Sequence, residues 1–156
     1  MFEECGIPFE NHYVIDTRTE ASSATLLIHE ASCIFLMGGH PRLQLELMRD
    51  KGLDIAICNA PAAVLGVSAG AINMAKRSLD TKESPVPYNG LALADITVKP
   101  HFKPENRQML ATVLQISREL PICAMEDESA IFMAGDCISH TGAIHWVSKG
   151  EICPFA

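Results

Sequence analysis

The stretch VLGVSAGAINMA, residues 64–75, constrains the fold more than any other part of this sequence. An apolar run ends at Ser68, with Gly66 two positions before it and Gly70 two positions after it. A run of small, helix-compatible residues follows. A sharp turn from strand to helix is crowded, so it requires small residues at those two positions. The stretch therefore predicts a buried strand, a tight turn at Ser68 and a helix that begins directly after it.

The rest of the chain alternates between short apolar runs and runs with helical periodicity. Strands are predicted at 13–16, 33–37, 63–67, within 95–102 and at 121–125, and helices at 23–31, 41–52, 69–79 and 104–120. Residues 80–90 are polar and contain prolines, which predicts a loop. Residues 130–152 predict a β-meander with turns at 135–136 and 141–142. Alternating strands and helices are typical of a mainly parallel sheet covered on both faces, and 156 residues suit one domain.

Composition narrows the function classes. The formal net charge is −7 and no run of Lys or Arg exceeds two residues, which disfavours binding to nucleic acid or an anionic membrane. Apolar residues make up 48% of the chain but aromatic residues only 6%, as in an aliphatic α/β core. The six cysteines include no C-x-x-C, and the six histidines form no ligand pattern. We therefore expect reduced thiols, no metal or cofactor, and a cytoplasmic protein without a signal peptide or membrane span.

Ser68 is a candidate nucleophile because the turn would expose its hydroxyl at the carboxyl edge of the sheet. The backbone N–H of Ala69 would point into the same site, where it could stabilise an oxyanion. The alternative interpretation is an ordinary junction of small residues, since the short G-x-S-x-G pattern also occurs by chance. A catalytic role for Ser68 therefore requires a base that takes the proton of its hydroxyl and an acid that orients the base.

Candidate partners follow two later strands. His101, in VKPHF, would act as the base, and the carboxylates of MEDES at 125–129 would orient it. In extended backbone Glu126 and Glu128 face one way and Asp127 the other, so only one side can serve His101. Side chains that follow parallel strands converge on one edge of an open sheet. A plain loop histidine and a solvated acidic turn remain the alternatives.

The combination resembles the peptidase E (aspartyl dipeptidase) family of serine peptidases, which is related to cyanophycinase. The matching pieces are IFLMGGHPRLQLEL, GVSAGAINMA, YNGLALADITVKPHF and LPICAMEDESAIF, in family order over about residues 33–133. The order Ser, His, acid differs from that of α/β-hydrolases, whose acid precedes the histidine. The nucleophile of the related amidotransferases is Cys, where this chain has Ser68.

The resemblance implies roles for individual residues. It makes Ser68 the nucleophile, His101 the general base and Asp127 the orienting acid, with Glu126 as the runner-up. It also implies an oxyanion hole formed by the backbone N–H groups of Gly39 and Ala69. Many relatives read G-G-G-N around the first of these glycines, whereas this chain has Met37 and His40 at the outer positions.

The resemblance also implies a fold. We expect one peptidase E-like domain over residues 1–156, a three-layer, flavodoxin-like or class I glutamine amidotransferase-like sandwich that lacks the family's first strand. The gap predicts self-association, for example as a homodimer.

The expected activity is hydrolysis of a small peptide or amide through an acyl-enzyme. The candidate substrate-binding residues are His40, Lys103 and Arg107, with Lys99 nearby, which predicts a carboxylate-bearing substrate. The alternatives are an inactive pseudoenzyme that acts as a binding module, and an esterase or acyltransferase with the same triad.

Overall fold

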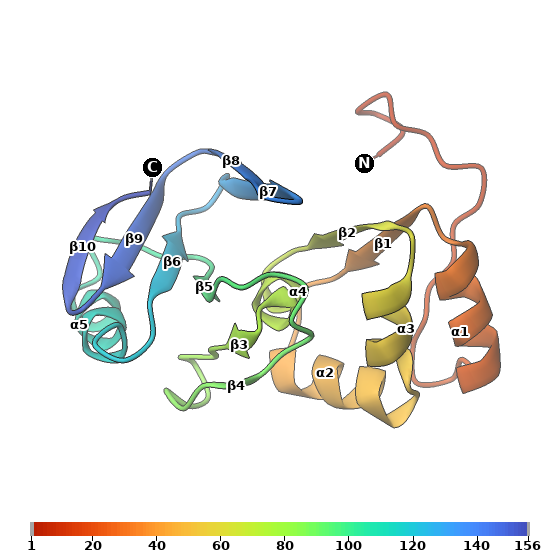
Figure 1. Ribbon diagram of the computed structural model, residues 1–156, viewed down its shortest axis with the longest axis horizontal. Coiled ribbons are helices and arrows are strands. Elements are labelled where there is room, and N and C mark those ends of the chain that lie inside the picture. Colours follow the sequence, from red (N-terminus) through yellow and green to blue (C-terminus); the bar gives the residue numbers. More distant parts are fainter. Residues whose placement is uncertain (1, 156) are drawn as a thin grey trace.

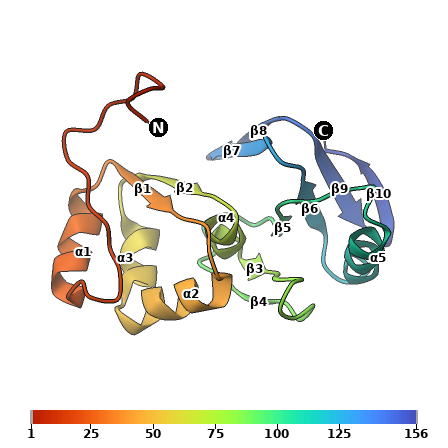
Figure 2. The same cartoon turned by 180° about the vertical axis from the view of Figure 1, so that it is seen from behind.

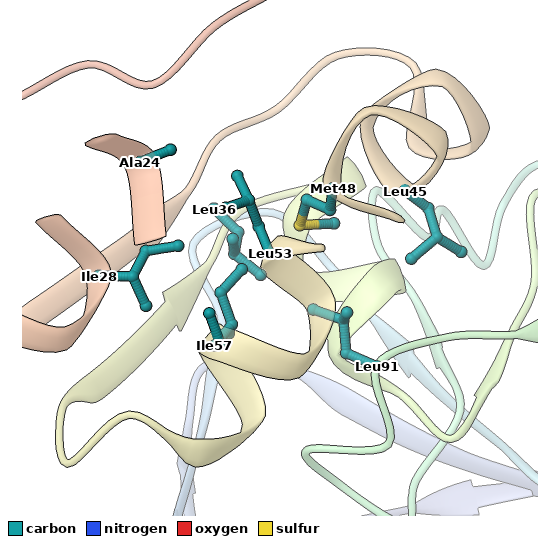
Figure 3. Packing of buried hydrophobic residues seen from close by; sticks show 9 residues of the cluster. Ala24, Ile28, Leu36, Leu45, Met48, Leu53, Ile57 and Leu91 are labelled. Carbon is teal, nitrogen blue, oxygen red and sulfur yellow. The ribbon is translucent and has the colours of Figure 1, made fainter. Parts of the chain in front are cut away.

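The N-terminal half of the chain is built on a parallel pair of strands, as seen in a computed structural model that describes residues 2–155 (Figure 1). The strands are β1 (Cys33–Leu36) and β2 (Ala63–Gly66), and the helices around them are α1 (Ala21–Glu30), α2 (Pro41–Asp50) and α3 (Leu53–Asn59). Leu36 of β1 and apolar residues of all three helices form one buried cluster (Figure 3). Its buried members are Ala24, Ile28, Leu36, Leu45, Met48, Leu53, Ala56, Ile57 and Leu91.

The C-terminal half contains a second, four-stranded sheet. Its order is β10 (Glu151–Pro154), β9 (Ile144–Ser148), β6 (Ile122–Met125) and β5 (Val98–Lys99). Only β5 and β6 are parallel, and the other neighbours are antiparallel. The helix α5 (Arg107–Ile116) lies beside this sheet when the molecule is seen from either side (Figures 1 and 2). One buried apolar cluster here consists of Leu79, Phe102, Val113, Ile122, Ala124 and Val147, and another consists of Ile72, Val98, Cys123 and Ile144.

The mixed α/β class is confirmed, but the expected single, mainly parallel sheet differs from what forms. The two parallel pairs, β1–β2 and β5–β6, belong to separate sheets. One reason is the shortness of β5, which is followed by Pro100 and by His101 at φ 56°. Proline has no N–H for a ladder and a positive φ ends the extended course, so β5 pairs with β6 over only two residues.

Several predicted elements also end early or do not form. Residues 13–16 are not a strand, because Asp16 instead makes a local turn with Arg18 and Thr19. The helix predicted over 69–79 is α4 (Ala69–Met74). Beyond it, backbone groups of 73–76 bond to the segment 90–94 rather than to the next helical turn. Two short strands, β3 (Arg77–Ser78) and β4 (Tyr88–Asn89), pair in this region.

Of the β-meander predicted over residues 130–152, the turn at 135–136 is confirmed, but the strands of the tail do not form one continuous sheet. The strands β7 (Ala130–Ala134) and β8 (Cys137–Thr141) form a hairpin with its turn at 135–136. Thr141 still pairs with Ala130 as the last residue of β8, so the bend that follows lies at Gly142, and β9 pairs with β6 and β10 rather than with β8. Apolar side chains are exposed on this hairpin, including Phe132, and on β2, including Leu65. Self-association stays a prediction. Within the part of the chain that the structure describes, no helix has the length and apolar character needed to span a membrane.

Candidate active site

Ser68 occupies a tight turn between β2 and α4, as its sequence context predicts. Its backbone has φ 53° and ψ −107°, a conformation that L residues rarely adopt and that costs on the order of 1–3 kcal/mol. A Cβ on Gly66 would lie 2.7 Å from the backbone nitrogen of Ala71, and a Cβ on Gly70 would collide with the carbonyl oxygen of Leu36. The requirement for small residues on both sides of the serine is therefore confirmed.

Ser68, His101 and Asp127 are brought together in a chain of hydrogen bonds. The Ser68 Oγ lies 3.0 Å from Nε2 of His101, and Nδ1 of the same ring lies 2.6 Å from Oδ1 of Asp127. His101 follows Pro100 at the end of β5, and Asp127 follows Glu126 at the end of β6. The contact between Ser68 and His101 joins the ends of strands that belong to different sheets.

Glu126, the runner-up for the orienting acid, points to a different histidine. Its Oε1 lies 2.7 Å from Nε2 of His145, on β9, while Asp127 faces His101. The two neighbouring carboxylates therefore separate, as the alternation expected of extended backbone predicts. Asp127 is the acid that the geometry places beside His101.

A pocket of about 200 Å³ opens beside Ser68. The backbone positions Gly39 and Ala69, suggested for the oxyanion hole, both line it. His40 lines it too, and its Nδ1 accepts a hydrogen bond from the backbone N–H of Leu43 at the start of α2. One of the three candidate substrate-binding residues therefore reaches the pocket.

The other two lie elsewhere, and different cations take their place. Lys103 and Arg107 are exposed and do not line the pocket, whereas Lys82 and Lys99 do. Lys99 is buried, and its Nζ donates a 2.7 Å hydrogen bond to the carbonyl oxygen of Pro100. Burial lowers the pKa of Lys99, and the charge of Lys82 lowers it further. The position of Lys99 two residues before His101 was a sequence signal that it could lie in the site, but nothing in the sequence of the loop indicated that Lys82 lines the pocket.

Within 2–155 no group of three or more His, Cys, Asp or Glu side chains is arranged to hold an ion. All six cysteines are free thiols, and burial raises the pKa of Cys123 to about 11. That thiol is therefore protonated at neutral pH and poorly nucleophilic.

Comparison with known families shows which family the chain belongs to. The sequence matches Peptidase family S51 over residues 1–141, which is most of the chain. The chain belongs to this family. The S51 match includes Ser68, His101 and Asp127, so the residues that meet in the structure lie inside the matched region.

Two solved structures share the fold of this S51 chain. A protein from Listeria monocytogenes EGD-e, described as a peptidase E, has a TM-score of 0.65 at 20% identity, over 79% of this chain. A peptidase from an acI-B1 Actinobacterium has a TM-score of 0.61 at 18% identity, over 84% of this chain. The S51 chain spans only 65% and 62% of the lengths of these two proteins. No curated protein matches the sequence significantly.

Proposed function

We propose that this chain is a serine hydrolase of the peptidase E type, which cleaves a small peptide or amide through an acyl-enzyme on Ser68. The observation that carries the proposal is the continuous series of hydrogen bonds from Ser68 through His101 to Asp127, at 3.0 and 2.6 Å. Both distances are within the range needed for proton transfer and for orienting the base. Membership of the S51 family supports the same reaction class.

In the proposed mechanism, Ser68, His101 and Asp127 act both in forming the acyl-enzyme and in its hydrolysis. The Ser68 Oγ attacks the substrate carbonyl carbon while its proton passes to Nε2 of His101. His101 then gives that proton to the leaving amine nitrogen as the C–N bond breaks. Water attacks the resulting ester by the same route. Asp127 accepts the Nδ1–H hydrogen bond throughout, which keeps Nε2 free to act as the base.

The oxyanion formed during attack needs donors close to Ser68. We assign this role to the backbone N–H groups of Gly39 and Ala69, because both residues line the pocket beside the hydroxyl. Gly39 has φ 143°, which only glycine adopts without strain, so this position is suited to turning its N–H inward.

The pocket chemistry favours a substrate that carries a carboxylate. Lys82, Lys99 and His40 line it, and Lys99 is buried there, so its interaction with an anion would be weakly screened. Asp80 and Glu83 also line the pocket and limit its net positive charge. A single carboxylate beside Lys99 therefore suits the pocket better than a multiply charged anion.

Lys99→Met tests this substrate preference because it keeps the length of the side chain and removes the charge. We expect kcat/KM for the dipeptide Asp-Leu to fall about tenfold, the loss of one charged hydrogen bond, while that for Asn-Leu changes little. Arg107→Ala is the matched control, since Arg107 is exposed and outside the pocket. An unchanged ratio of Asp-Leu to Asn-Leu in Lys99→Met would remove Lys99 from substrate recognition.

The activity itself is tested by comparing amide with ester substrates. Purified protein is incubated with Asp-Leu, Asn-Leu, Leu-Leu and p-nitrophenyl acetate, and the products are quantified. A peptidase is expected to hydrolyse at least one dipeptide in a reaction that depends on His101. Turnover of the ester alone would instead favour the esterase alternative.

A further inference from the structure

His145 and Glu126 form a second histidine–carboxylate pair, which lies directly beside the proposed catalytic one. Their side chains meet at 2.7 Å and are 24% and 34% exposed. By contrast, the side chains of His101 and Asp127 are 48% and 61% exposed. The more buried pair is therefore the one with the surroundings needed to hold a fixed position.

Each member of the buried pair is connected to a neighbour in sequence of a triad residue. Glu126 immediately precedes Asp127. On the other side, the ring of His145 packs edge-on against Phe102, which immediately follows His101, with ring centroids 5.4 Å apart. Phe102 is 1% exposed. One imidazole on β9 thus contacts both segments that carry the base and the acid.

Backbone hydrogen bonds also connect the segments that carry His101 and Asp127 to the ends of β6 and β9. The N–H of Phe102 donates a 2.8 Å hydrogen bond to the carbonyl oxygen of Met125, the last residue of β6. The N–H of Glu126 donates to the carbonyl oxygen of Ala143, just before β9, and Ser129 Oγ donates to the carbonyl oxygen of Glu126 at 2.6 Å. The turn that carries Asp127 is therefore anchored through Glu126 at both its backbone and its side chain.

The segments need such an anchor because their backbones are strained. His101 has φ 56° and Glu128 has φ 61°, both in the left-handed region that non-glycine residues rarely occupy. Conformations of this kind persist only where surrounding contacts over-determine them. The exposed side chains of His101 and Asp127 have little packing of their own to supply those contacts.

We propose that Glu126 and His145 are positioning residues. They hold the segments that carry His101 and Asp127 in a fixed relative position, so that the Asp127 carboxylate meets Nδ1 of His101. The proposal rests on the proposed serine hydrolase function for its kinetic consequence but not for its geometry. Neither Glu126 nor His145 lines the pocket, so the pair acts through the triad and not on the substrate.

His145→Phe is the primary variant, because it keeps an aromatic ring against Phe102 and removes the hydrogen bond to Glu126. Glu126→Gln is its matched control, since the amide oxygen can still accept from Nε2 of His145. Glu126→Ala removes the other partner and serves if His145→Phe does not fold. Circular dichroism well below the unfolding midpoint establishes that each variant is folded.

Two readouts are used. The first is the rate at which a fluorophosphonate modifies Ser68, which depends on correct placement of His101. We expect about a tenfold fall in His145→Phe and in Glu126→Ala, no further fall in the double variant, and near wild-type reaction in Glu126→Gln. For a dipeptide substrate, kcat should fall while KM stays unchanged. A reaction rate at the wild-type level in both single variants would overturn the proposal.

The second readout does not require catalysis. The ¹⁵N chemical shifts of the His101 ring, assigned by comparison with His101→Gln, report which nitrogen carries the proton. Wild-type protein should carry it on Nδ1, and His145→Phe should show a mixture of the two tautomers. If wild-type protein fails to react with the fluorophosphonate, the proposed function fails, and these shifts alone decide the positioning role. Identical His101 shifts in wild type and His145→Phe would overturn it.

Discussion

Replacing Ser68 with alanine is expected to lower the turnover of a dipeptide or ester substrate by about a million-fold, to the level left by binding and oxyanion donors alone. Fold and stability should hardly change. Alanine is no larger than serine, and the lost hydroxyl bonds a half-exposed imidazole rather than a buried group. Initial rates combined with a thermal unfolding midpoint separate the two effects.

Ser139→Ala is the matched control for this change. Ser139 is an exposed serine of β8 and does not line the pocket, so its loss should leave both activity and unfolding unaffected. Residual turnover of Ser68→Ala above a few per cent of wild type would mean that another group is the nucleophile.

Replacing Gly70 with alanine is expected to destabilise the protein by about 3 kcal/mol or more, a large part of the 5–15 kcal/mol that holds a typical domain together. The new methyl group would collide with the backbone carbonyl of Leu36, which is held by the pairing of β1 with β2. A backbone group cannot move aside as a flexible side chain can. The urea midpoint measures the loss.

Gly38→Ala provides the comparison at a nearby glycine. A Cβ there would sit 3.6 Å from Cβ of Ser68, which is ordinary van der Waals contact, so its urea midpoint should lie close to that of wild type. Equal midpoints for Gly70→Ala and wild type would show that α4 does not pack against β1 as described.

The strand-to-helix turn was predictable because its requirements are local. Small residues at 66 and 70 and an apolar run before Ser68 leave few other conformations. The positions of His101 and Asp127 after strands were predictable for a similar reason, since polar residues that interrupt buried strands lie at the ends of those strands.

Features decided by distant contacts were not predictable. The helix that starts at Ala69 was expected to reach residue 79 on local propensity, but bonds from 73–76 to 90–94 end it at Met74. The helix α3 went unpredicted because it follows α2 after only a short turn at Gly52, whose φ of 67° ends one helix and begins the next. The separation of the two parallel pairs, β1–β2 and β5–β6, into different sheets likewise depends on which strands pair with each other.

The neighbours of side chains in the site were likewise not predictable from the sequence. The sequence places Lys99, Lys103 and Arg107 close to His101 but does not say which of them face the pocket, and only Lys99 does. It offers both Asp127 and, as the runner-up, Glu126 as the acid for one histidine, whereas Glu126 bonds to His145 on β9. That partner lies 19 residues further along the chain, out of reach of any local pattern.

If Ser68 is a nucleophile activated by His101, a reagent that modifies reactive serines should label it. The most direct measurement treats wild type, Ser68→Ala and His101→Ala with a fluorophosphonate and locates the adduct by mass spectrometry of peptides. We expect a single phosphonyl group on Ser68 in wild type, none in Ser68→Ala, and a rate of modification reduced at least about a hundredfold in His101→Ala. Modification of Ser68 at the same rate without His101, or an unmodified Ser68 in folded wild-type protein, would contradict the role of Ser68 as that nucleophile.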